Sequence, residues 1–189
     1  WVGDAPAEVE VSKDGRFAYV SLRTEGLVAQ VDIATRSVVQ RYAVMPDPRA
    51  LAISDDGATL YVAGHRTGQT GRYPYGEDPI EEETDIMALE TETGTVTQIF
   101  SDVGNVLTDL VLDDDANHLY VAETTSFPER GLITLETPPF ESQITVFDTT
   151  NGEQLRTQTI QPASEGQGYP LGIQAIDIHD DIVWAVTEG

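Results

Sequence analysis

Two arginines and a histidine lie close together in a chain that has few other cations. His65, Arg66 and Arg72 fall within eight residues, and Tyr73 and Tyr75 follow directly. Guanidinium groups bind carboxylates and phosphates through paired hydrogen bonds, and tyrosine rings form an apolar wall beside such ligands. These five residues are therefore a candidate ligand-binding site. The competing interpretation, which the sequence favours, is that the arginines pair with the acidic residues that follow them.

The same segment ends in a cluster of carboxylates. Glu81, Glu82 and Glu83 stand in a row, and Asp85 follows one residue later. Calcium takes about six to eight oxygen ligands from flexible carboxylates and carbonyls, so these four residues are a candidate Ca²⁺ site. Runs of charge are more often solvated surface, and this alternative stays open.

No catalytic residue is predicted within the chain, and no cofactor beyond that possible Ca²⁺. The chain has no cysteine, which excludes a disulfide, a thiolate nucleophile and a covalently attached c-type haem within these residues. It also lacks the Gly-x-Ser-x-Gly sequence of a nucleophile elbow. Carboxylates are too abundant for any pair of them to indicate catalysis.

A repeat in the sequence predicts the elements that must position these residues. Residues 12–20 (SKDGRFAYV) return as residues 54–62 (SDDGATLYV) and, in altered form, as residues 113–121 (DDDANHLYV). The spacings are 42 and 59 residues. Short strands and acidic turns at a period near 40 are typical of β-propeller blades. We therefore predict an all-β fold, a propeller of four-stranded antiparallel blades, in which the Asp-Gly turns and the repeated tyrosines are scaffold.

Alternating apolar residues and turn residues divide the chain into about three and a half blades. The predicted blades cover about residues 7–44, 48–101 and 106–160, and half of a fourth covers about residues 172–187. Closed propellers usually have about four to eight blades. We expect this arc to belong to a seven- or eight-bladed ring, completed by the remainder of its own chain or by another protein chain.

The candidate ligand site falls where the repeats differ most. The connection between the second and third strands of a blade is short in the first blade, but it spans about residues 65–84 in the second and 124–142 in the third. In a propeller these connections lie on the face that frames the central channel. Long loops on a regular scaffold are a common location for binding residues.

Two segments resemble the YVTN-type propeller repeat. These are residues 48–63 (PRALAISDDGATLYVA) and residues 144–152 (ITVFDTTNG). The resemblance implies an extracytoplasmic protein, which is periplasmic, secreted or on the cell surface. Relatives with such repeats include secreted binding proteins, cytochrome-linked propellers and lactonases, so the resemblance implies a fold rather than one chemistry.

The charge of the chain narrows the classes of partner that it is expected to bind. With 33 acidic against 10 basic residues, the formal net charge is -23, which repels nucleic acid and anionic lipid. No apolar run reaches the length of about 18 residues that spans a bilayer, so no membrane insertion is expected.

The function predicted from these features is a noncatalytic binding or scaffolding segment of a larger extracytoplasmic protein, with its ligand or partner engaged by the long loops. The alternative is the propeller part of an enzyme. That enzyme would be a c-type-cytochrome-linked oxidoreductase whose haem lies in a missing domain, or a hydrolase such as a lactonase whose other site residues lie outside this fragment.

Overall fold

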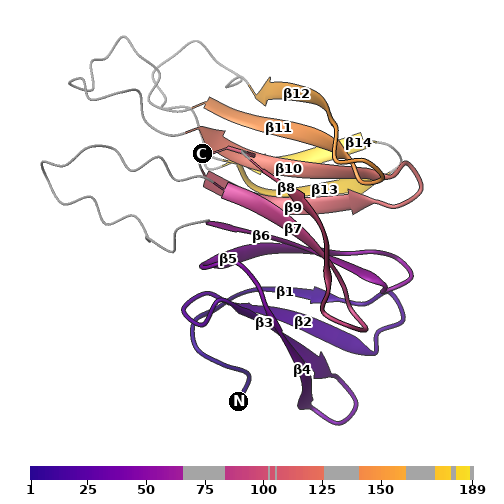
Figure 1. The fold of residues 1–189 in the computed structure, drawn as a ribbon. Helices are drawn as coiled ribbons and strands as arrows, with labels where there is room; N and C mark the ends of the chain where they lie inside the picture. Colours follow the sequence, from indigo (N-terminus) through magenta and orange to yellow (C-terminus); the bar gives the residue numbers. More distant parts are fainter. Residues whose placement is uncertain are drawn as a thin grey trace, which may run out of the picture.

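Strands make up the regular secondary structure of the described residues (Figure 1). The computed structural model describes residues 1–65, 84–101, 103–104, 106–125, 141–160, 173–179 and 182–187. The strands in these ranges are β1 (Pro6–Val11), β2 (Phe17–Leu22), β3 (Leu27–Asp32), β4 (Ser37–Ala43), β5 (Pro48–Ile53), β6 (Thr59–His65), β7 (Thr84–Glu90), β8 (Val96–Phe100), β9 (Val106–Asp113), β10 (His118–Thr125), β11 (Glu141–Asp148), β12 (Gln154–Ile160), β13 (Ile173–His179) and β14 (Ile182–Thr187).

The strands form three four-stranded sheets and one two-stranded sheet, each of them antiparallel. The orders are β1-β2-β3-β4, β5-β6-β7-β8, β9-β10-β11-β12 and β13-β14, so every sheet is a simple meander. The first strands of successive sheets are in contact, β1 with β5, β5 with β9 and β9 with β13. From this common side the sheets fan apart, with β4 and β12 at opposite extremes (Figure 1). The chain is therefore part of a β-propeller, as predicted, with three blades and the first two strands of a fourth.

The repeated Asp-Gly segments form the tight turns between the first and second strands of a blade. Asp14 accepts hydrogen bonds from the Ser12 hydroxyl at 2.6 Å and from the Arg16 amide at 2.9 Å, and Gly15 takes a φ of 69°. The second blade repeats this arrangement at Ser54, Asp56 and Gly57. In the third blade, whose turn has no glycine, Asn117 adopts the positive φ, 55°. Asparagine tolerates this region better than most residues, which explains how the altered copy keeps its turn.

The core consists of three apolar clusters, one between each pair of consecutive blades. Tyr19 of the first blade packs against the second blade, Tyr61 of the second against the third, and Tyr120 of the third against the half blade. The partners of Tyr19 include Leu51, Leu60, Val62 and Leu89. Those of Tyr61 include Leu110, Leu119, Val121 and Phe147. Those of Tyr120 include Ile173 and Ile176. All three tyrosines are buried, which confirms that they are core residues. Each sheet therefore depends on its neighbours for burial.

Truncation of one residue in these clusters tests this dependence. We expect Leu60→Ala to lower the free energy of unfolding by about 2–5 kcal/mol, because Leu60 is fully buried between the first two blades and its loss leaves a cavity. Val96→Ala, at an exposed position on β8, is the matched control and should change stability little. Urea denaturation followed by circular dichroism measures both. Equal losses would contradict the assignment of the core.

Candidate functional site

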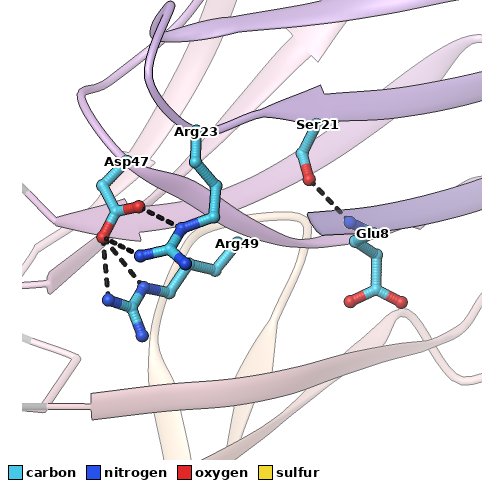
Figure 2. Close-up of polar contacts among 5 residues, drawn as sticks. All are labelled: Glu8, Ser21, Arg23, Asp47 and Arg49. Atoms are coloured by element: carbon cyan, nitrogen blue, oxygen red, sulfur yellow. Dashed lines mark hydrogen bonds and ion pairs between the residues drawn. The ribbon is translucent and has the colours of Figure 1, made fainter. Parts of the chain in front are cut away.

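An arginine pair and a buried aspartate form a compact charged group between the first two blades. Arg23 directly follows β2, Asp47 lies in the link from β4 to β5, and Arg49 is the second residue of β5. The Nε atom of Arg23 donates to Oδ1 of Asp47 at 2.5 Å, and its Nη2 donates to Oδ2 at 3.2 Å. Nε and Nη2 of Arg49 donate to the same Oδ2 at 2.9 and 2.8 Å (Figure 2). We call these three residues the arginine cluster.

A close approach between backbone segments holds the link in place. Gly64 lies on β6, directly against the link, and a Cβ atom at this position would stand 2.7 Å from Cγ of Met45 and 2.9 Å from the carbonyl oxygen of Asp47. Only glycine allows the link to lie so close. Asp47 itself has a φ of 49°, an uncommon value for a residue with a side chain, and its hydrogen bonds to the two arginines fix this conformation.

The arginines determine the charge state of the buried aspartate. The Asp47 side chain is only 3% exposed, and burial by itself would raise its pKa. Hydrogen bonds from Arg23 and Arg49 outweigh burial and hold the pKa of Asp47 below its ordinary value. Asp47 is therefore ionised at neutral pH, and the arginine cluster carries one net positive charge.

The arginine cluster remains open to a ligand. The side chains of Arg23 and Arg49 are 35% and 31% exposed. Within the described residues, their hydrogen bonds all go to Asp47 and leave the Nη1 group of each arginine uncommitted. Two positioned guanidinium groups with free N–H donors can bind a carboxylate or a phosphate.

Carboxylates from the first strands of three blades line a hollow in the arc. Glu8 and Glu10 on β1, Asp109 on β9 and Asp177 on β13 line a hollow of about 290 Å³, together with Ala52 of β5. Burial, and next the negative charge of Asp109, raise the pKa of Glu8 to about 7. Figure 2 shows Glu8 on the strand beside the arginine cluster, with its amide donating to Ser21 Oγ at 3.0 Å. A carboxyl group with such a pKa can exchange protons at neutral pH.

A second acidic side chain is buried inside the third blade. Oε1 of Glu123 accepts hydrogen bonds from Thr145 Oγ1 at 2.6 Å and from Gln143 Nε2 at 2.8 Å, whereas its Oε2 has no hydrogen-bond partner among the residues that the structure describes. Oε2 lies against Gly104 in the link between the second and third blades. Burial raises the pKa of Glu123, because a charged carboxylate at this place would lack the hydration that water gives it.

Most of the candidate residues predicted from the sequence lie outside the described residues. These are Arg66, Arg72, Tyr73 and Tyr75 of the ligand site, and Glu81, Glu82 and Glu83 of the calcium site. The structure places His65 at the end of β6 and Asp85 in β7, where the two strands pair, but it describes no side chain for His65. Both sites therefore remain predictions. Among the described residues, no group of three or more histidines, aspartates and glutamates is placed to hold a metal ion.

Sequence reasoning missed the arginine cluster and Glu8. Arg23 and Asp47 are 24 residues apart, and no local motif joins them. The sequence feature that could have indicated the cluster is the scarcity of basic residues. In such a chain, any arginine in a connection on the channel face is a candidate for binding an anion.

Comparison with known proteins agrees with the fold. A family model described as "Lactonase, 7-bladed beta-propeller" matches residues 1–77, less than half of the chain. The matched part includes β1 to β6 and thus the whole arginine cluster and Glu8. No curated protein matches the chain.

Solved propellers superpose on nearly the whole chain. Hydrazine synthase of Kuenenia stuttgartiensis is 21% identical with a TM-score of 0.66, and the alignment covers 93% of this chain and 39% of that one. Sqt1 of Saccharomyces cerevisiae is 10% identical with a TM-score of 0.63, over 98% of this chain and 43% of that one. The propeller domain of Myceliophteria thermophila Cps50 (Swd1) is 14% identical with a TM-score of 0.61, over 99% and 50%. The chain thus spans half or less of the length of these propellers.

None of its described segments is a helix of the length and apolar character that a membrane crossing requires.

The buried carboxyl group of Glu123 predicts a pH-dependent stability. Its pKa in the folded protein lies above the reference value of 4.5, so the folded state holds the proton more tightly than the unfolded state does. Stability from this group is therefore fully present below about pH 4.5 and falls as pH rises through the folded-state pKa. We expect Glu123→Gln to be more stable than the wild type at pH 8, with the difference shrinking toward pH 4.

Thermal unfolding followed by circular dichroism at these two pH values measures the effect. Glu153→Gln, at an exposed position of the same blade, is the control and should leave the pH profile unchanged. A lower stability of Glu123→Gln at pH 8 would show that the charged form of Glu123 is the one the fold requires.

Proposed function

We propose that this chain is the ligand-binding arc of a larger extracytoplasmic β-propeller, and that it binds a small carboxylate- or phosphate-bearing molecule without transforming it. The observation that carries the proposal is the arginine cluster: two partly exposed guanidinium groups, fixed by one buried carboxylate, in a chain with a formal net charge of -23. Elsewhere on such a surface an anion is repelled, so a local positive group acts as a selective binding position.

The place of the cluster in the fold supports this proposal. Arg23 lies in a connection between the second and third strands of a blade, and Asp47 lies in a link between blades. Both kinds of segment reach the face on which the sequence predicts the long loops with His65, Arg66 and Arg72. In the proposed arrangement these loops belong to the same binding face, and the protein is of the YVTN type.

Charge-neutral variants of the arginines test anion binding. We expect Arg23→Ala and Arg49→Ala each to raise the dissociation constant for citrate or inorganic phosphate about tenfold or more, since a hydrogen bond to a charged group contributes about 1.5–3 kcal/mol. Isothermal titration calorimetry at low ionic strength measures this constant.

Arg36→Ala provides the matched control for the arginine variants. Arg36 lies in the turn between β3 and β4, at the other end of the blade, so its loss changes the net charge equally but should leave binding unchanged. If all three variants weaken anion binding equally, the loss follows from the change in net charge alone, and the proposed site would be wrong.

A second candidate function, lactone hydrolysis, is favoured by Glu8. Its pKa of about 7 suits a general base, and residues 1–77 match a lactonase propeller family. In this mechanism the Glu8 carboxylate takes a proton from water, the resulting hydroxide attacks the lactone carbonyl carbon, and the ring C–O bond breaks. The proton then passes to the released alkoxide, which gives the open hydroxy acid. The arginine cluster would hold an acidic substituent of the substrate.

The pH dependence of hydrolysis distinguishes this second function. With 6-phosphoglucono-δ-lactone as the probe, which carries an acidic substituent, the protein-catalysed rate should rise with pH, reach half its maximum near pH 7 and level off above it, since only ionised Glu8 accepts a proton. Glu8→Gln should lower that rate about 100-fold or more, within the usual contribution of a general base. A pH-stat assay with a protein-free blank measures both. A wild-type rate equal to the blank would exclude hydrolysis of this probe and leave the binding function.

A further inference from the structure

A polar hollow lies between the first two blades, at the end of the strands opposite to the arginine cluster. The first blade contributes Phe17 of β2, Gln30 of β3 and Gln40 of β4, and the second contributes Thr91 and Glu92 from the turn between β7 and β8. We call this space the interblade hollow. Its volume of about 350 Å³ lies within the range of about 300–1,000 Å³ that is usual for small-molecule sites.

One amide group in the interblade hollow is available to a ligand. The side chain of Gln40 is partly buried, and within the described residues it makes no hydrogen bond. Its neighbour Gln30 differs, because Nε2 of Gln30 donates to the hydroxyl of Tyr19 at 3.0 Å. A glutamine amide offers a carbonyl acceptor and two N–H donors, so Gln40 brings its full hydrogen-bonding capacity to the hollow.

The next interface shows what a glutamine at this place does when it is not free. Gln98 is the counterpart of Gln40, since Gln98 pairs with Ala88 of β7 as Gln40 pairs with Gln30 of β3. The Gln98 amide bridges to the following blade: its nitrogen donates to the carbonyl oxygen of Thr149 at 3.1 Å, and its oxygen accepts from the amide of Gly152 at 2.8 Å. The glutamine between the second and third blades is therefore consumed by the scaffold.

A tyrosine hydroxyl explains why Gln40 is spared this role. Thr91 corresponds to Thr149, because each directly follows the third strand of its blade. The hydroxyl of Tyr42 donates to the carbonyl oxygen of Thr91 at 2.7 Å. Tyr42 takes the register position that Phe100 takes in the second blade, and phenylalanine has no hydroxyl with which to make this bond. The tyrosine thus bridges the first two blades and leaves the glutamine free.

The charges around the interblade hollow select against anions. Four carboxylates and one ammonium group line it, those of Asp14, Asp55, Asp56, Glu92 and Lys13. Lys13 pairs with Asp55 across the two blades, so its charge is already compensated. A surface of this sign repels a negatively charged ligand, whereas hydroxyl groups can donate to carboxylates and both donate to and accept from an amide.

We propose that the interblade hollow binds a neutral sugar. In this arrangement the Gln40 amide bonds to two neighbouring hydroxyl groups, and the ring of Phe17 supplies an apolar surface for the C–H groups of the sugar. The site is separate from the anion site of the proposed function, because it lies at the other end of the strands and carries the opposite charge.

Binding of D-glucose, D-galactose and D-mannose tests the proposal. Saturation-transfer NMR should show contact between the wild-type chain and at least one of these sugars, and titration gives its dissociation constant. Gln40→Leu keeps the size of the side chain and should raise this constant about tenfold or more, since two hydrogen bonds are lost. Gln158→Leu, at an exposed position on β12, is the matched control and should leave the constant unchanged.

Tyr42→Phe tests the cause of the opening without removing a residue that lines it. We expect the Gln40 amide to turn to the Thr91 carbonyl oxygen, as Gln98 does to Thr149, and sugar binding to weaken about as much as in Gln40→Leu. The side-chain amide resonances of Gln40 should shift in the absence of sugar. In a Gln40→Leu background, Tyr42→Phe should cause no further loss of binding, whereas general damage to the site would add to the loss.

Four outcomes would overturn the proposal. The first is a wild-type chain that binds none of the three sugars, and the second is a Gln40→Leu variant that binds as well as the wild type. The third is binding of putrescine but of no sugar, which would assign the interblade hollow to a cation. The fourth is loss of sugar binding in Arg23→Ala, which would place the sugar in the arginine cluster. Citrate binding should be the same in Gln40→Leu as in the wild type, so the two sites are judged independently.

Discussion

Packing of each blade against the next is the interaction on which the other features of this structure depend. A four-stranded sheet has two faces, and a small sheet cannot bury either face by itself. The three apolar clusters are all interfaces between consecutive blades. The arginine cluster and the acidic hollow exist only because these interfaces hold the inner strands side by side.

Variation at one repeated position shows how a regular scaffold acquires local chemistry. Leu22, Gly64 and Glu123 each lie three residues after the buried tyrosine of the second strand. Leu22 and Glu123 fill the space beneath the preceding segment, whereas Gly64 leaves that space empty so that the link carrying Asp47 can approach. The backbone pattern at this position is the same in each blade, but the side chain differs. Leu22 supplies packing in the first blade, Gly64 leaves room for a charged group in the second, and Glu123 supplies a buried carboxyl group in the third.

Charge has two different roles in this chain. The large excess of carboxylates gives a formal net charge of -23, and this composition predicts weak affinity for nucleic acid and anionic lipid. The local effect is more selective, because burial between blades changes the properties of individual groups. Two arginines lower the pKa of Asp47 and keep it ionised, whereas burial and the charge of Asp109 raise the pKa of Glu8 to about 7. Burial also raises the pKa of Glu123, which favours its protonated form. The position of each side chain in the fold therefore decides which carboxyl groups are ionised at neutral pH.

The sequence by itself determined the blade architecture, because a local pattern carries it. Alternating apolar residues define strands, Asp-Gly and Asp-Ala-Asn segments define turns, and recurrence of the strand-turn-strand pattern defines units that must stack. The tertiary structure decided the candidate site. Arg23, Asp47 and Arg49 come from different elements, and their convergence depends on how closely one link approaches β6 at Gly64. The pKa of Glu8 likewise depends on Asp109, about a hundred residues away in the chain. Periodicity is a local property of a chain, whereas burial and the distance between charges are properties of the packed molecule.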